Sequence, residues 1–157
     1  MKIQCFRGVA SILALLLAAG CAHSSRQERA SGPPISGILQ TAGGPLKYEV
    51  AGSGHPLVLI HAGIVDHRMW DGQFEVFSRS YRVVRYDTRG FGASTVDEGH
   101  EFSNREDLAE LMDHLDMPRA CLLGCSRGGQ IATDFTLERP ERVDALILVG
   151  AGIGGDH

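Results

Sequence analysis

The sequence predicts an α/β fold, with a mostly parallel, twisted sheet and helices on both faces. From residue 57 onward, short runs of Val, Leu and Ile alternate with segments of helical apolar spacing, in the order strand, helix, strand, helix, strand, helix, strand. This alternation predicts right-handed crossovers that place parallel strands in one sheet. The chain has 157 residues, 43% of them hydrophobic and 22% charged, which is enough for one compact domain with its own core.

The first residues predict an export signal. Lys2 and Arg7 form a positive amino-terminal region, an apolar run follows over residues 9–19, and small residues precede Cys21. The segment resembles the signals of bacterial lipoproteins, which implies a signal peptide over residues 1–20, a lipid on Cys21 and anchoring to a membrane of the cell envelope. The alternatives are an ordinary secretory signal and an uncleaved anchor, although the run is shorter than the roughly 20 residues that span a bilayer.

Residues 21–34 predict a flexible tether behind the lipidated cysteine, because they are rich in Ser, Arg, Gln, Gly and Pro and have no apolar periodicity. The folded domain is therefore predicted over residues 35–157. It begins with two strands, residues 35–41 and 46–51, joined by a Gly-Gly-Pro turn at residues 43–45.

A strand, a helix and another strand are expected next. Residues 57–61 carry apolar side chains on both faces, which is typical of a strand inside a parallel sheet. Met69, Phe74 and Phe77 recur at roughly helical spacing, and strand character returns over residues 81–86.

The same alternation continues to the end of the domain. Ser103 is followed three residues later by Glu106, a capping-box arrangement that predicts a helix start. The apolar stripe of this helix consists of Leu108, Leu111, Met112 and Leu115. A strand over residues 120–123, a helix over residues 130–138 and a strongly apolar strand over residues 143–149 follow.

Net charge and cysteine positions exclude some functions. The formal charge of −4 and the pI near 5.9 leave no basic excess for a phosphate backbone, so no nucleic-acid partner is expected. Cys5 lies in the signal and Cys21 is the lipid site. Cys121 and Cys125 are about 13 Å apart along one predicted strand, which is too far for a disulfide.

The histidines show no spacing typical of metal ligands. We expect His55, His67, His100 and His114 to lie in turns or on polar faces as solvated residues. The sequence therefore predicts neither a metal nor an organic cofactor.

A Gly-x-Ser-x-Gly motif lies between a predicted strand and a predicted helix. Residues 124–129 read Gly-Cys-Ser-Arg-Gly-Gly, which is typical of a nucleophile elbow with Ser126 at its tip. The turn strains the serine backbone and brings the residues two before and two after it so close that side chains would collide. Gly124 and Gly128 remove that collision. Cys125 is expected to pack in the core, because the elbow points only its central residue outward.

Three further segments carry a family resemblance. Residues 61–63 read His-Ala-Gly at the end of a predicted strand, and Trp70 follows nine residues after the histidine. Residues 87–94 read Asp-Thr-Arg-Gly-Phe-Gly-Ala-Ser, and residues 139–143 read Arg-Pro-Glu-Arg-Val. With the elbow, their order and spacing resemble the amino-terminal part of an α/β-hydrolase over roughly residues 35–152.

The resemblance implies acyl chemistry at Ser126. The backbone N–H groups of Arg127 and Gly63 would bind the developing oxyanion. A serine nucleophile implies hydrolysis of small carboxylic esters or lactones through an acyl-enzyme. Asp87 and Arg89 would pin a loop beside the site, and His61 would orient the oxyanion loop rather than act as the base.

The resemblance also implies that the triad acid and histidine follow the serine on later loops. The chain ends at His157, so we expect a fold truncated after the sixth strand. The chain would be nearly inactive, since losing the triad histidine costs roughly a millionfold in turnover. Residues 145–149 would form an exposed edge that favours pairing with another strand. The alternatives are a non-catalytic, partner-dependent or oligomeric binding module, and a short enzyme with an improvised histidine base.

Overall fold

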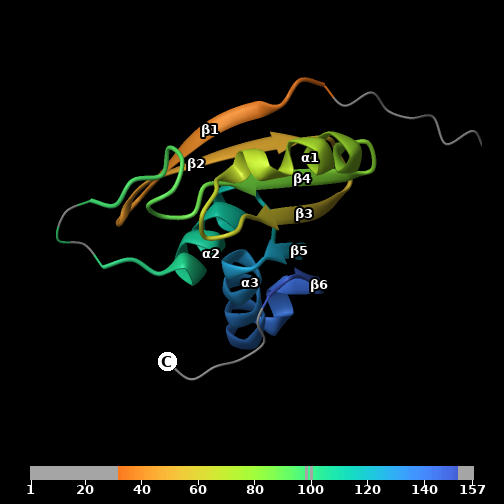
Figure 1. The fold of residues 1–157 in the computed structure, drawn as a ribbon. Coiled ribbons are helices and arrows are strands. Elements are labelled where there is room, and N and C mark those ends of the chain that lie inside the picture. The colour runs from red at the N-terminus through yellow and green to blue at the C-terminus, as the bar shows by residue number, and fades with distance from the viewer. Residues whose placement is uncertain (1–31, 98, 100, 152–157) are drawn as a thin grey trace, which may run out of the picture.

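The computed structural model describes residues 32–97, 99 and 101–151 (Figure 1). The strands are β1 (Ile35–Thr41), β2 (Gly44–Ala51), β3 (His55–Ile60), β4 (Tyr81–Tyr86), β5 (Ala120–Cys125) and β6 (Val143–Val149). The helices are α1 (Asp71–Ser78), α2 (Asn104–His114) and α3 (Arg127–Glu138), with short 3₁₀ helices over His67–Trp70 and Pro140–Arg142. Among these described helices none has the length and apolarity to cross a membrane. The predicted signal peptide, Cys21, His100 and His157 lie outside the described residues.

The sheet is parallel except at one edge. Its strand order is β1-β2-β4-β3-β5-β6. β1 and β2 form an antiparallel hairpin, and β2 also runs antiparallel to β4. β3 lies parallel between β4 and β5, and β6 is parallel to β5. The predicted mostly parallel α/β sheet is therefore confirmed.

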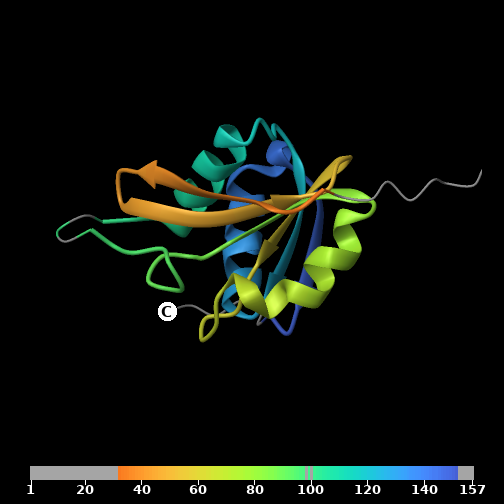
Figure 2. The same ribbon diagram turned by 90° about the horizontal axis from the view of Figure 1, so that it is seen from above.

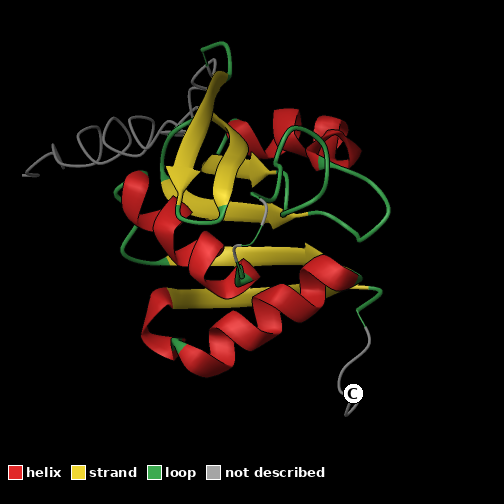
Figure 3. Ribbon diagram, turned by 90° about the vertical axis from the view of Figure 1, so that its left-hand side faces the viewer, coloured by secondary structure: helices red, strands yellow, loops and turns green. Residues whose placement is uncertain are grey.

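Helices cover both faces of the sheet, with α2 and α3 on one face and α1 on the other (Figures 2 and 3). In β3, Val58 and Ile60 point into the core under α2 and α3, while Leu57 and Leu59 point into the core under α1. Helix side chains that complete the two cores include Leu108, Leu111, Met112, Ile131 and Phe135 on one face and Phe74 on the other. A strand with apolar residues on both faces is stable only when both faces are covered, as they are here.

The hairpin turn is tighter than the sequence predicted. Only Ala42 and Gly43 lie between β1 and β2, so β2 begins at Gly44. The Thr41 hydroxyl donates to the Gly44 carbonyl at 3.0 Å and closes the loop. Gly44 has φ +111°, a backbone that L side chains rarely adopt.

The turn between β5 and α3 is a single residue. β5 extends to Cys125 and α3 begins at Arg127, so Ser126 alone connects them. The sequence pattern placed the helix start at Gln130 because glycine disfavours helix interiors, and Gly128 and Gly129 lie in the first turn. The structure includes both glycines in the helix.

The carboxyl-terminal strand β6 forms one edge of the described sheet. Ile147 and Val149 are 45% and 48% exposed. An edge strand presents unpaired N–H and C=O groups as well as these side chains.

Candidate active site

Ser126 lies at the carboxyl end of β5 in a strained backbone conformation. Its φ is 50° and its ψ is −115°, values that non-glycine residues rarely adopt. Its N–H donates to the Val149 carbonyl of β6 at 3.0 Å, and its carbonyl accepts from the Gly129 N–H at 2.9 Å. Neighbouring elements therefore hold this conformation from both sides, and the serine is exposed.

Two glycines make room for the turn. A Cβ added to Gly124 would lie 2.3 Å from the Gly128 carbonyl oxygen. A Cβ added to Gly128 would lie 2.3 Å from the Ile60 carbonyl oxygen of β3. Both contacts are with backbone, which cannot move aside cheaply, so larger residues do not fit at either position.

Among the described residues, two backbone N–H groups near Ser126 have no hydrogen-bond acceptor. Arg127 is the first residue of α3, and its N–H therefore has no partner inside the helix. The Ala62 N–H donates to the Met69 sulfur at 3.3 Å, whereas no acceptor among the described residues engages the Gly63 N–H. A Cβ added to Gly63 would lie 3.1 Å from Arg127 Cδ, so the two segments are in contact.

His61 fastens the loop that carries Gly63. Its imidazole is 1% exposed. Nε2 accepts from the Thr88 N–H at 2.9 Å, so the proton lies on Nδ1, which donates to the Ala62 carbonyl at 2.7 Å. Burial lowers the pKa of His61 below 6.5. The ring is thus neutral and joined to two loops.

Asp87 and His67 are bonded to each other, and the expectation that His67 is a solvated residue is wrong. His67 Nδ1 lies 2.6 Å from Asp87 Oδ1, and the same oxygen accepts from the His67 N–H at 2.9 Å. Asp87 Oδ2 accepts from the Ala93 N–H at 2.8 Å. The His67 side chain is only 13% exposed, because this carboxylate holds it against the sheet.

The Arg89 guanidinium donates hydrogen bonds to groups on several segments of the protein. It is 2% exposed, and it donates to both carboxylate oxygens of Asp107 at 2.9 Å. It also donates to the Thr95 carbonyl and to the Thr41 hydroxyl. Its guanidinium therefore joins the turn after β4 to α2 and to the hairpin.

A further charged group near the site was missed by sequence reasoning. Arg85 donates to Glu49 Oε2 at 2.7 Å, and its guanidinium lies 4.3 Å from the centre of the Phe74 ring. His67 Nε2 lies 3.7 Å from Glu49 Oε1, which links this pair to Asp87. Glu49 and Arg85 face each other across β2 and β4, a register that the sequence pattern did not specify.

No base contacts Ser126 within the described part of the chain. His55 pairs with Asp144 at 3.1 Å, and His114 shares a hydrogen bond with the Tyr48 hydroxyl at 3.0 Å. His61 and His67 are engaged as described above. The described histidines thus give no support to an improvised base.

One group of side chains has the composition of a metal site. Ligand atoms of Asp66, His67 and Asp87 lie within 4.8 Å of one another. The Arg68 guanidinium donates to Asp66, however, and His67 is bonded directly to Asp87. Protein partners therefore satisfy these groups without an ion.

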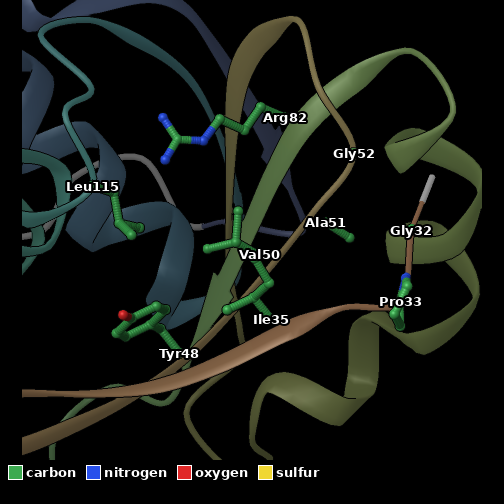
Figure 4. A pocket seen from close by; sticks show the side chains of 9 residues that line it. All are labelled: Gly32, Pro33, Ile35, Tyr48, Val50, Ala51, Gly52, Arg82 and Leu115. Carbon is green, nitrogen blue, oxygen red and sulfur yellow. The ribbon is translucent and has the colours of Figure 1, made fainter.

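The structure also contains a pocket of about 310 Å³ at the opposite edge of the sheet (Figure 4). Ala51 at the end of β2, Arg82 near the start of β4 and Leu115 after α2 contribute to its lining. Ser126 follows the carboxyl end of β5, whereas this pocket lies at the amino ends of the parallel strands. The pocket is thus separate from the elbow.

The comparison with protein families decides the identity. Residues 55–156 match the model of the family described as the alpha/beta hydrolase fold. The chain belongs to the α/β-hydrolase family. The matched region contains Gly63, the turn with Asp87 and the strand-to-helix turn with Ser126.

Two relatives and one solved structure illustrate this α/β-hydrolase assignment. The 2-hydroxy-6-oxo-6-phenylhexa-2,4-dienoate hydrolase of Comamonas testosteroni is 34% identical over 120 residues, which cover 71% of this chain and 42% of the relative. The pimeloyl-(acyl-carrier protein) methyl ester esterase of Nitrosomonas europaea is 32% identical over 106 residues, 68% of this chain and 41% of the relative. A hydrolase from Pseudomonas aeruginosa superposes with a TM-score of 0.67 at 36% identity, over 72% of this chain and 44% of that chain. The α/β-hydrolase chain thus spans about two fifths of the length of the curated relatives.

Proposed function

We propose that this α/β-hydrolase is a serine hydrolase that cleaves a carboxylic ester or lactone through an acyl-enzyme at Ser126. The observation that carries the proposal is the backbone of Ser126, whose φ of 50° holds an exposed serine between β5 and α3. Such strain persists only where the surrounding structure enforces it, and it is concentrated at functional sites.

The chemistry follows from the groups around Ser126. Its Oγ adds to the carbonyl carbon while its proton passes to a base, and the N–H groups of Arg127 and Gly63 bind the oxyanion. The bond to the leaving oxygen then breaks, and that oxygen takes the proton. Water attacks the acyl-serine in the second half-reaction and releases the acid. Each aligned donor lowers the barrier by about 3 kcal/mol.

The base is proposed to come from outside the described residues, since each described histidine is bonded elsewhere. A serine without its histidine loses roughly a millionfold in turnover. A protein in which Ser126 lacked this histidine would therefore hydrolyse esters near the background rate.

The names of the relatives support hydrolysis. One is named as a hydrolase of a dienoate and the other as a methyl ester esterase. The second name favours an ester as the substrate of this chain.

Ester hydrolysis by the native polypeptide isolated from its own cells tests the proposal. We expect hydrolysis of p-nitrophenyl butyrate, and a loss of about a thousandfold or more in the Ser126→Ala variant. Cys125→Ser is the matched control, because it changes the neighbouring side chain and leaves the nucleophile intact. A Ser126→Ala variant as active as the native protein would overturn the serine mechanism.

The exposed edge of β6 favours a second candidate function, a non-catalytic module that pairs with another copy of the chain. Ile147 and Val149 on this strand are about half exposed, and the edge offers backbone hydrogen bonds to a partner strand. Light scattering of the purified chain should then report a dimer whose population falls in an Ile147→Lys variant. A well-folded monomer at all concentrations would exclude this function.

We also propose that a lipid on Cys21 anchors the protein to a membrane of the cell envelope. The positive residues, the apolar run and the small residues before Cys21 support this proposal. The intact mass of the polypeptide from the membrane fraction should include a diacylglyceryl group. A Cys21→Ser variant that remains in the membrane fraction would contradict it.

A further inference from the structure

Arg127 carries a positive charge without an acidic partner beside the nucleophile. Among the described arginines, those that pair with Asp or Glu are Arg68, Arg79, Arg85, Arg89, Arg105, Arg119, Arg139 and Arg142. Arg127 and Arg82 are the two that do not. Arg127 is half-buried, and no acceptor in the described part of the chain bonds its guanidinium. A charge partly removed from water usually has a partner.

The side chain of Arg127 lies along the proposed oxyanion site. Its stem packs against the backbone of Gly63, where an added Cβ would lie 3.1 to 3.2 Å from Cδ and Cβ. Its guanidinium carbon lies 5.5 Å from the centre of the Phe91 ring. Phe91 in turn contacts His61, with ring centres 5.4 Å apart. The cation is therefore next to the loop that would bind the scissile carbonyl oxygen.

The contacts of Arg127 leave its hydrogen-bonding capacity unused. Packing against Gly63 involves the methylene groups, and the contact with Phe91 is with the ring. The planar fork of N–H donors thus remains available, and its geometry matches a carboxylate.

We propose that Arg127 is a specificity determinant that binds a carboxylate on the substrate. The site would then select esters or lactones whose acyl part carries a carboxylate a few bonds from the scissile carbonyl. This inference rests on the proposed function, because it names the substrate class of the same site.

A structural role for Arg127 predicts a different result. If its side chain only held Gly63 against Phe91, its removal would lower the binding affinity for charged and neutral substrates equally. The ratio of their affinities therefore separates recognition from clamping.

Binding to a Ser126→Ala variant of the chain tests the inference without requiring turnover. The probes are monomethyl adipate and methyl 6-methylheptanoate, in which an isopropyl group replaces the carboxylate. We expect the charged ester to bind about tenfold or more tightly by calorimetry, as for a charge-assisted hydrogen bond. The preference should disappear when Arg127→Met is added, return in part with Arg127→Lys, and weaken with added salt.

Arg82→Met on the Ser126→Ala background is the matched control. Arg82 also lacks an acidic partner among the described residues, but it lines the pocket at the far edge of the sheet (Figure 4). Its replacement should leave the preference unchanged. An undetectable affinity for monomethyl adipate, a preference that survives Arg127→Met, or equal losses for both esters would each overturn the inference. Failure of the serine mechanism would show instead in the turnover of Ser126→Ala, which this binding ratio does not measure.

Discussion

Arg89 and Asp107 form a buried ion pair between the turn after β4 and the first turns of α2. Two N–H groups of the guanidinium donate to the two carboxylate oxygens, each at 2.9 Å. The side chains of Arg89 and Asp107 are 0% and 6% exposed. A single arginine thus holds the loop next to the candidate site against the helical layer.

Replacing Arg89 by Met should leave the buried Asp107 carboxylate without a cationic partner. We expect the free energy of unfolding in urea to fall by about 3 kcal/mol or more. Arg79→Met is the control, since its pair with Glu75 is exposed and should contribute about 0.5 kcal/mol or less. Similar losses in the two variants would contradict the structural role given to Arg89.

Replacing Gly128 in the elbow by a larger residue should destabilise the protein. Gly128→Ala would place a methyl group 2.3 Å from the Ile60 carbonyl oxygen, so we expect a loss of about 3 kcal/mol in stability. Gly72→Ala in α1 meets nothing within 4 Å and should stabilise the protein by up to about 1 kcal/mol. Thermal unfolding of both variants checks the contrast, and a Gly128→Ala protein as stable as the original would refute it.

Burial of His61 should make stability depend on pH. Because desolvation lowers its pKa below 6.5, the unfolded chain binds a proton more tightly than the folded one. The stability contributed by the neutral ring is therefore complete above about pH 6.5 and is lost as the pH falls through the lower, folded-state pKa. We expect the free energy of unfolding, measured with urea between pH 7 and 5, to change less steeply with pH in His61→Asn than in the unchanged chain.

His55→Gln provides the control for this slope. The His55 side chain is 50% exposed, and its replacement should leave most of the pH dependence in place. If His61→Asn and the unchanged chain lose stability in parallel, His61 is not the group responsible.

Local patterns were sufficient for most of the fold. β4 and β6 have the bounds that their apolar runs predicted, and Ser103 caps α2 by accepting from the Glu106 N–H. Boundaries next to glycines differed, at the hairpin and around the elbow, and β3 begins at His55 rather than at residue 57. Glycine has no strong local preference, so packing decides whether it belongs to a turn, a strand or a helix.

The sequence by itself determined the α/β class, the order of the elements and the position of Ser126 at a strand-to-helix turn. These properties depend on apolar periodicity and on motifs within a few residues of one another. Only the tertiary structure decided that His67 bonds Asp87, that Arg85 pairs with Glu49 across 36 residues, and that Arg127 is left without an acidic partner. Such contacts depend on strand register and on which loops meet at one edge of the sheet, and both are set when the whole chain packs.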